Sequence, residues 1–220
     1  MAKVILFGAG QIAEMAYSYL THQSPHEVAA LTVDGAYLDR KEHLGLPVVA
    51  FEQAEELYPP DEYEMFVAVS YRSMNRTRAE KCMQARGKGY RLITHVSPHA
   101  VVSPDATLGD NCIICEHSVV QPFVRVGDGV IMGDGNHVGH HTVIGDYCFV
   151  TSHVVVCGGV QVGPRSFLGV NSTIRDRITI GAECVIGAGA LILRDTPARS
   201  IYVGAAARRL PGDTTAIYDF

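Results

Sequence analysis

The segment "VIMGDGNHVGHHTVIGDYCFV", residues 130–150, repeats a unit of six residues. Met132, Val138, Ile144 and Val150 are apolar and stand six apart, and a glycine directly follows each of the first three. Six steps of about 100° place successive residues on three different sides of an α-helix, so this period excludes a single helix face. A strand that turns every six residues accounts for the period. The segment therefore predicts short strands separated by regular bends.

The same phase extends far beyond this segment. Nine of the sixteen residues that directly follow Val102 through Ile192 in this phase are glycine, as repeated backbone bends favour. The fourth position after each aliphatic is mostly small or β-branched, which predicts a second, narrow inward row. These features describe a solenoid whose coils stack into a β-helix. The inward aliphatic positions are Val96, Val102, Leu108, Ile114, Val120, Val126, Met132, Val138, Ile144, Val150, Val156, Val162, Leu168, Ile174, Ile180, Ile186 and Ile192.

Residues 1–94 follow a different pattern. Apolar runs such as "KVILFG" and "EVAALTV" alternate with amphipathic stretches such as "QIAEMAYSYL", which predicts an α/β layer with a parallel sheet. In the first turn, "GAGQIA", Gly8 and Gly10 stand where backbone amides approach a phosphate at a helix N-terminus. Asp34, near the end of the second predicted strand, is a candidate ligand of a ribose or base. The turn alone fits a nucleotide site and a ligand-free tight turn equally well.

Length, charge and cysteine usage limit the class of protein. The chain has 220 residues, enough for one large or two modest domains, and its net charge of −5 gives no general attraction to nucleic acid. The start resembles no signal peptide, and no segment has about 18 uninterrupted apolar residues. We expect a soluble cytoplasmic protein with no nucleic-acid partner and no membrane insertion. The cysteines form no CxxC pair, and those of the narrow row, Cys112, Cys148 and Cys184, are expected to serve packing.

Histidines cluster on the outside of the predicted coils. His140 and His141 follow the inward Val138 and stand on a corner, whereas His137 lies at an outward-facing strand position. An imidazole at an exposed corner can act as a general base that removes a proton from an attacking amine or hydroxyl. In the plainer interpretation, one or two of these side chains only cap turns or meet at a subunit interface.

The repeats resemble those of the hexapeptide-repeat proteins, whose triangular coils of 18 residues form a left-handed parallel β-helix. The motifs "FGAGQIA", "HVSPHAVVSPDATLGDNC" and "GHHTVIGDYC" together resemble the sugar acyltransferases of the bacterial NeuD and PglD type. So does the ending "YVGAAARRL", in which Ala206 replaces a usual proline. This resemblance implies a Rossmann-like domain over residues 1–94 that binds a nucleotide-linked sugar, a left-handed β-helix over residues 95–206 and a tail over residues 207–220.

The resemblance further implies a homotrimer that acetylates an aminosugar for surface polysaccharide or glycan synthesis, with acetyl-CoA between adjacent β-helices. Aligning "GHHTVIGD" with the family's His-acid-x-V-I-G segment places the general base at His140. His141 stands where the family has an Asp or Glu that orients the base. Either His141 orients His140 as a neutral tautomer, or a carboxylate from another coil does so, with Asp134, Asp146 and Glu116 as candidates.

Residues for both substrates follow from the same resemblance. Gly158, Val170 and Ala188 match positions whose backbone lines the acetyl-CoA cleft. Gly8, Gly10, Asp34 and Arg76 match the pocket for the nucleotide, and His137 is a further candidate substrate contact. A charged helix face is the plainer explanation of Arg76, and packing is the plainer role of Cys157, an imaginable nucleophile beside His153.

Three other functions are alternatives. O-acetylation of a free or activated sugar acid needs the same base, and a nucleotide-sugar binder needs no catalysis. Zinc-dependent hydration, as in carbonic anhydrases of this fold, needs three histidine ligands. His117 and His153 share one corner with His99 and have the two-coil spacing of two such ligands, but the third position falls on Gly158, and those enzymes lack the front domain. We therefore expect no metal site.

Overall fold

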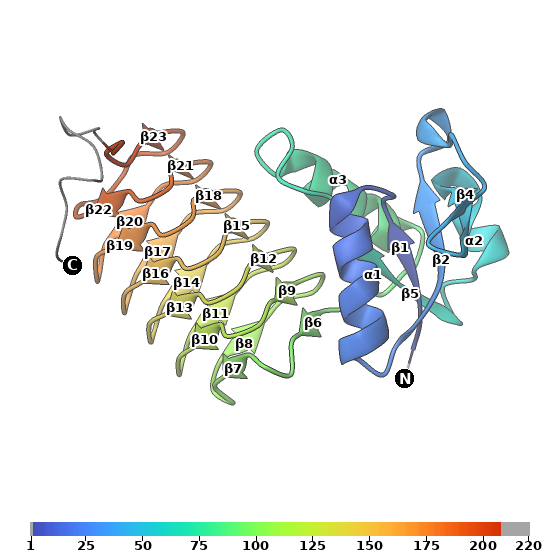
Figure 1. The fold of residues 1–220 in the computed structure, drawn as a ribbon, viewed down its shortest axis with the longest axis horizontal. Coiled ribbons are helices and arrows are strands. Elements are labelled where there is room, and N and C mark those ends of the chain that lie inside the picture. The colour runs from blue at the N-terminus through green and yellow to red at the C-terminus, as the bar shows by residue number, and fades with distance from the viewer. Residues whose placement is uncertain (1, 208–220) are drawn as a thin grey trace, which may run out of the picture.

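The computed structural model describes residues 2–207 and divides them between a front α/β part and a stack of short strands (Figure 1). Of the predicted tail at 207–220, residues 208–220 lie outside the described part, and the predicted boundaries at residues 94 and 206 stay predictions. The front part holds β1 (Lys3–Phe7), α1 (Gln11–Gln23), β2 (Glu27–Val33), η1 (Gly35–Tyr37), β3 (Glu42–His43), β4 (Leu46–Ala50), η2 (Phe51–Gln53), α2 (Ala54–Leu57), β5 (Tyr63–Val67) and α3 (Arg76–Gly87).

The sheet of the front part has the strand order β3-β4-β2-β1-β5. Its strands are parallel, as predicted, except that the short edge strand β3 runs antiparallel to β4. Successive residues of a strand point to opposite faces. Val4 and Leu6 therefore share a buried cluster with Leu20 of α1, whereas Ile5 shares one with Cys82 of α3. The helices α1 and α3 thus cover opposite faces of this sheet.

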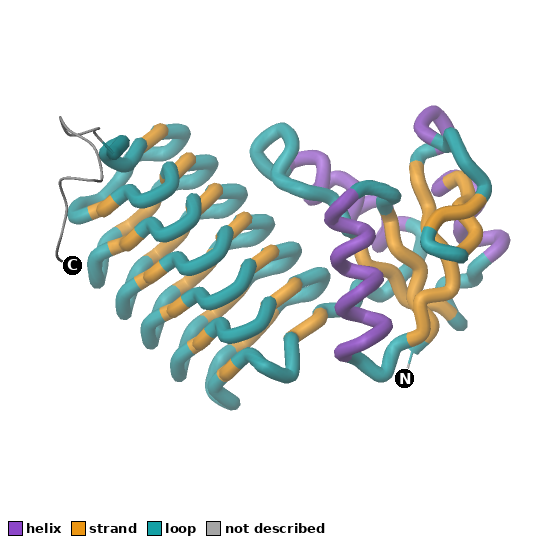
Figure 2. Tube along the Cα trace, viewed as in Figure 1, coloured by secondary structure: helices purple, strands orange, loops and turns teal. Residues whose placement is uncertain are grey.

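The remaining strands form a parallel β-helix with three sheets, in which two-residue strands alternate with turns (Figure 2). The β13 sheet contains β7 (Val101–Val102), β10 (Val119–Val120), β13 (His137–Val138), β16 (Val155–Val156), β19 (Thr173–Ile174) and β22 (Leu191–Ile192). The β14 sheet contains β8 (Thr107–Leu108), β11 (Arg125–Val126), β14 (Val143–Ile144), β17 (Gln161–Val162) and β20 (Thr179–Ile180). The β15 sheet contains β6 (His95–Val96), β9 (Ile113–Ile114), β12 (Ile131–Met132), β15 (Phe149–Val150), β18 (Phe167–Leu168), β21 (Val185–Ile186) and β23 (Ile201–Tyr202).

The coil length and the inward rows agree with the six-residue pattern. His137 pairs with Val119 and Val155, which lie 18 residues before and after it, so each coil has three sides of six residues. The predicted aliphatic positions from Ile114 to Ile192 are buried in one continuous core. The predicted narrow row is inside as well, where Cys112, Cys148 and Cys184 are buried.

Three corners connect the sheets, and each is named here by its position. The histidine corner joins the β13 and β14 sheets and includes residues 121–124, 139–142, 157–160 and 175–178. The docking corner joins the β14 and β15 sheets and includes residues 109–112, 127–130, 145–148, 163–166 and 181–184. The third corner joins the β15 and β13 sheets and includes residues 115–118, 133–136, 151–154, 169–172 and 187–190.

The repeated glycines stand at the start of the bends, as predicted, but positive φ is not the reason. Positive φ values fall two residues later, for example at Asn111, His141 and Tyr147, and not at the glycines that follow the inward aliphatics. Those glycines are needed because adjacent coils stack closely at the corners. A Cβ added to Gly139 would lie 2.5 Å from the backbone nitrogen of Gly158 in the next coil, closer than side chains approach backbone.

The front part contacts the docking corner and the beginning of the third corner. The backbone N–H of Val67 donates to Oδ1 of the buried Asn111 at 2.7 Å. Arg86 pairs with Asp110 at 3.1 Å and with Asp128 at 2.7 Å. On the α1 side, Ile113 of β9 belongs to the same buried cluster as α1. The histidine corner receives no hydrogen bond or ion pair from the front part within residues 2–207.

Candidate active site

His140 lies on the histidine corner with its side chain exposed to solvent, as predicted from the repeat. Its backbone is held on both sides by neighbouring coils. The N–H donates to Oε1 of Gln121 at 2.9 Å, and the carbonyl accepts from the N–H of Gly159 at 2.8 Å. The main chain that carries the imidazole is therefore fixed by the coil before and the coil after.

The ring of His140 rests on Gly158, the residue 18 positions later at the same corner. A Cβ added at Gly158 would come within 2.8 Å of both Cε1 and Nε2 of the ring. Any larger residue at position 158 would force the imidazole to move. The His140 ring can occupy this position only because Gly158 has no side chain.

His141 supplies a hydrogen-bond partner to this ring. Nδ1 of His140 and Nδ1 of His141 are 3.1 Å apart, so one of the two must carry a proton and donate it. His141 is in the left-handed region with φ of 58°, and its ring centroid lies 4.9 Å from that of Phe123. When Nδ1 of His140 donates to His141, Nε2 of His140 is left with a lone pair that can accept a proton.

The carboxylates considered as alternatives lie elsewhere. Glu116 and Asp134 are on the third corner, where Oε1 of Glu116 accepts from Nε2 of Gln23 at 2.5 Å. Asp146 is on the docking corner and accepts from the N–H of Asp128. Within the described chain, none of these carboxylates is hydrogen-bonded to His140. The geometry thus favours His141 as the partner that orients the base.

His137 occupies a different surface from the other two histidines. It is the first residue of β13, half-buried, and its side chain faces outward from the β13 sheet, as predicted. It therefore lies on the β13 sheet, three residues before His140 of the histidine corner.

A pocket of about 420 Å³ lies at the carboxyl ends of β1 and β5 in the front part. It is lined by Gly10, Gln11 and Ile12 at the start of α1, and by the segment from Ala68 to Arg72. Gly10 leaves open space in front of the N-terminus of α1, where free N–H groups favour an anion. Gly8 has another task, because its φ of 124° and the carbonyl of Ala68, 2.8 Å from an added Cβ, exclude a side chain.

Two of the residues predicted for the nucleotide make other contacts. Oδ1 of Asp34 accepts from Nζ of Lys81 at 2.5 Å, and that ammonium also lies 5.2 Å from the ring centroid of Phe7. Arg76 pairs with Glu183 of the docking corner at 2.8 Å. Neither side chain lines the pocket beside Gly10. Arg76 instead ties α3 to the β-helix.

The three positions predicted for acetyl-CoA lie on two corners. Gly158 is on the histidine corner beside His140, whereas Val170 and Ala188 are exposed, 18 residues apart, on the third corner. These two corners flank opposite edges of the β13 sheet. The three residues can line one cleft only where the histidine corner of one copy meets the third corner of another.

The structure shows where the buried cysteines and the candidate metal ligands lie. Burial raises the pKa of the Cys112 and Cys148 thiols to about 12, as suits packing residues. Within residues 2–207, Cys115, Glu116 and Asp134 form the one group of three with ligand atoms within 4.8 Å of each other. The group excludes His117 and His153, and Gly158 lies on a different corner from both histidines.

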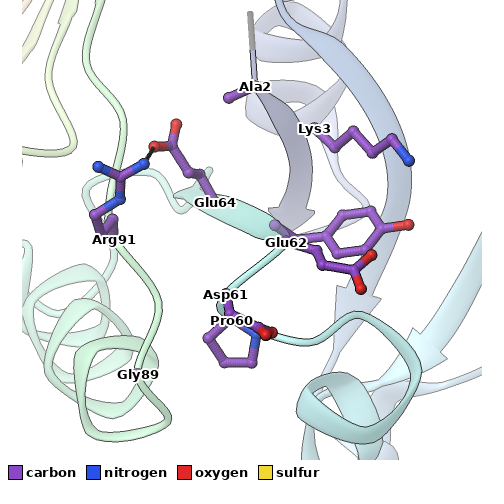
Figure 3. A pocket seen from close by; sticks show the side chains of 9 residues that line it. Ala2, Lys3, Pro60, Asp61, Glu62, Glu64, Gly89 and Arg91 are labelled. Atoms are coloured by element: carbon purple, nitrogen blue, oxygen red, sulfur yellow. Dashed lines mark hydrogen bonds and ion pairs between the residues drawn. The ribbon is translucent and has the colours of Figure 1, made fainter.

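A second pocket, of about 640 Å³, opens at the amino ends of β1 and β5 (Figure 3). Lys3, Glu62 and Glu64 line it, and Glu64 is paired there with Arg91. It lies at the opposite end of the sheet from Gly10 and contains none of the predicted site residues.

None of the described helices combines the length and the apolar character needed to cross a membrane.

Known proteins share both the repeat and the architecture. The bacterial transferase hexapeptide (six repeats) family matches residues 159–194, and no curated protein matches the sequence. A mutant of perosamine N-acetyltransferase from Caulobacter crescentus, in complex with CoA and GDP-perosamine, has a TM-score of 0.84 and 29% identity, covering 97% of this chain and 98% of that one. The acetyltransferase domain of PglB from Neisseria gonorrhoeae FA1090, in complex with acetyl coenzyme A, has a TM-score of 0.78 and 25% identity, covering 94% and 98%. WeeI from Acinetobacter baumannii AYE, with a TM-score of 0.79 and 19% identity over 96% and 100%, shares the fold.

Residues 159–194 match the hexapeptide family, and the chain as a whole has the fold of these solved structures, with a parallel β-helix behind a front α/β part. More narrowly, it has the two-part architecture of the sugar N-acetyltransferases over nearly its whole length, which confirms the resemblance seen in the sequence.

Proposed function

We propose that the protein is an acetyltransferase that moves an acetyl group from acetyl-CoA to the amino group of a nucleotide-linked aminosugar. The observation that carries this proposal is the exposed His140 imidazole, seated on Gly158 with its Nδ1 hydrogen-bonded to His141. Two structural relatives with this architecture support it, since one holds CoA and GDP-perosamine and the other holds acetyl coenzyme A.

The reaction needs one base and no covalent enzyme intermediate. The sugar amine attacks the thioester carbonyl while Nε2 of His140 takes a proton from the nitrogen, and a C–N bond forms. The tetrahedral intermediate then collapses, the C–S bond breaks, and the imidazolium returns the proton to the departing sulfur of CoA. His141 holds the ring in the tautomer that leaves Nε2 free.

The nucleotide-linked sugar is expected to bind in the pocket beside Gly10. Free N–H groups at the start of α1 suit a phosphate of the nucleotide, and Gly8 makes the tight turn that places them. Asp34 and Arg76 are weaker candidates, because Lys81 and Glu183 already neutralise their charges. His137 remains a candidate contact to the sugar from the β13 sheet.

The base and the pocket of one chain lie on different sides of the β-helix, so we propose that the working unit is a homotrimer. The outer face of the β13 sheet is mostly apolar, with Val101 64% and Leu191 62% exposed, and His137 and Thr173 are its polar members. By contrast, the outer face of the β14 sheet carries Thr107, Arg125 and Gln161. Packing of copies through the β13 sheet would bring the histidine corner of one chain to the third corner of the next.

In that arrangement, acetyl-CoA lies between two chains, along Gly158 of one and Val170 and Ala188 of the other. The acetylated sugar would serve surface polysaccharide or glycan synthesis in the cytoplasm. These assignments rest on the resemblance to relatives together with the positions of the corners.

Release of CoA thiol tests the proposed function. Acetyl-CoA is incubated with UDP-, GDP- and dTDP-linked aminosugars and, as a control, with the matching hydroxyl sugars. Turnover restricted to the amino compounds supports N-acetylation. Turnover with the hydroxyl sugars or a sugar acid would replace it by O-acetylation, and binding without thiol release would indicate a sugar-nucleotide binder.

A further inference from the structure

Arg78 of α3 is a fully buried arginine, and every partner of its guanidinium is a backbone carbonyl. A guanidinium has five N–H donors in a fixed plane. Nε donates to Gly129 at 2.9 Å, and NH2 donates to Tyr147 at 2.9 Å and Cys148 at 3.3 Å. NH1 donates to Val69 at 3.1 Å and Ser70 at 3.2 Å. These five hydrogen bonds use all five N–H donors of the guanidinium.

These carbonyls come from three separate segments. Gly129 and the pair Tyr147 and Cys148 belong to successive coils at the docking corner, whereas Val69 and Ser70 belong to the segment that lines the pocket beside Gly10. A single side chain therefore bonds the pocket wall and the β-helix at the same time. No carboxylate among the described residues pairs with it. Its charge is balanced by carbonyl dipoles and by the ring of Phe149, whose centroid lies 5.8 Å from Cζ, and burial lowers its pKa to about 10.

The segment that Arg78 holds is strained and has few other supports. Ser73, Met74 and Asn75 have consecutive φ values of 52°, 53° and 62°, which side chains rarely adopt. Nδ2 of the buried Asn75 donates to the carbonyl of Arg165 at 3.2 Å, again across to the docking corner. Tyr71 lies edge-on to Phe149 with ring centroids 5.1 Å apart. The strained conformation persists because these contacts to the β-helix hold it.

We propose that Arg78 is a positioning residue for the nucleotide-sugar pocket, which fixes the segment 69–75 on the β-helix and so orders one wall of the pocket. A lysine cannot replace it, because an ammonium presents three donors from one point and cannot reach carbonyls of three segments. This inference rests on the proposed function for the identity of the ligand, but the ordering of the segment is independent of it.

The test compares Arg78→Lys with Arg86→Lys. Arg86 also ties α3 to the docking corner, through Asp110 and Asp128, but it does not contact the segment 69–75. The first readout is hydrogen exchange of amides 69–75 in the free protein. The second is the Kd for GDP-perosamine, or for whichever nucleotide-linked aminosugar the wild type acetylates, alongside the Kd for CoA.

We expect Arg78→Lys to raise exchange in the segment and to weaken sugar-nucleotide binding by roughly tenfold, as loss of hydrogen bonds from a charged donor does. Exchange in the β-helix and the Kd for CoA should stay as in the wild type, and Arg86→Lys should leave the segment protected. Wild-type exchange in Arg78→Lys, or equal exposure of the segment in Arg86→Lys, would overturn the proposal.

A second variant keeps the test decisive if Arg78→Lys does not fold. Arg78→Met removes all five hydrogen bonds of the guanidinium and places no charge in the buried site. It should also raise exchange over the segment, and unchanged protection there would count against the proposal. If the proposed function is wrong, the wild-type protein will neither bind nor acetylate any aminosugar. The hydrogen exchange of residues 69–75 still decides the role of Arg78 in that case.

Discussion

The imidazole of His140 rests on Gly158, so closely that a Cβ at position 158 would lie 2.8 Å from two atoms of the ring. The two residues are 18 apart and stack because each coil has 18 residues. The repeat thereby gives His140 a fixed backbone and leaves its ring against a residue without a side chain.

Gly158→Ala should displace the ring of His140 and lower kcat by about 10²-fold, because small misplacements of a reacting group are costly. Steady-state thiol release measures the effect. Gly87→Ala is the matched control, since an added Cβ at Gly87 meets nothing within 4 Å, and it should keep wild-type activity. Full activity in Gly158→Ala would show that the ring position seen here is not the reactive one.

His141 should orient His140 through its Nδ1 atom, which accepts a hydrogen bond from Nδ1 of His140. His141→Ala removes the partner of His140 Nδ1, and we expect kcat to fall roughly fivefold to tenfold, the usual effect of one hydrogen bond. Asn tolerates positive φ and carries an acceptor oxygen, so His141→Asn should retain more activity than His141→Ala. Equal activity in the two variants would assign the orientation of His140 to another group.

The apolar face of the β13 sheet should carry the contacts between copies. Val155→Glu places a charge on this face and should convert the proposed trimer into monomers, which light scattering coupled to size exclusion measures. Thiol release should be lost together with the trimer, because in the proposed arrangement the base and the pocket come from different chains. Gln161→Glu, on the outer face of the β14 sheet, is the control and should stay trimeric. An active Val155→Glu monomer would contradict a site shared between chains.

Direct transfer predicts that no cysteine carries the acetyl group. Cys157→Ser should therefore retain kcat, and mass spectrometry of the wild type after mixing with acetyl-CoA alone should find no stable acetylated protein. Loss of activity in Cys157→Ser, together with an acetyl group on Cys157, would replace the direct mechanism by a covalent one.

Most of the fold follows from two sequence patterns, which are the alternation of apolar and amphipathic segments in residues 1–94 and the six-residue repeat that follows it. The regular aliphatic positions from Val96 to Ile192 specify the coil length, because stacking aligns each inward side chain with the one 18 residues away. The conformation of the turns was missed. Positive φ falls at positions such as His117, His141 and His153, and although histidine is enriched at positive φ, residue type alone does not specify these positions.

The sequence predicted the site residues whose positions follow from the repeat. It did not predict those whose positions depend on how the front part packs against the β-helix. The exposure of His140 and His141 follows from the phase, and the spacing of 18 could also have revealed Gly158 as the seat of the ring. The contact of Arg76 with Glu183 and the burial of Arg78 depend on how α3 meets the docking corner, which neither pattern encodes.

Single-turnover acetyl transfer by His140→Gln tests the central claim most directly. Gln keeps a polar side chain over Gly158 but cannot accept the proton, so the rate should fall by about 10²-fold to 10⁴-fold, the usual contribution of a general base. The Kd values for acetyl-CoA and for the aminosugar should remain those of the wild type. A near-wild-type rate in His140→Gln would contradict the claim that His140 is the base.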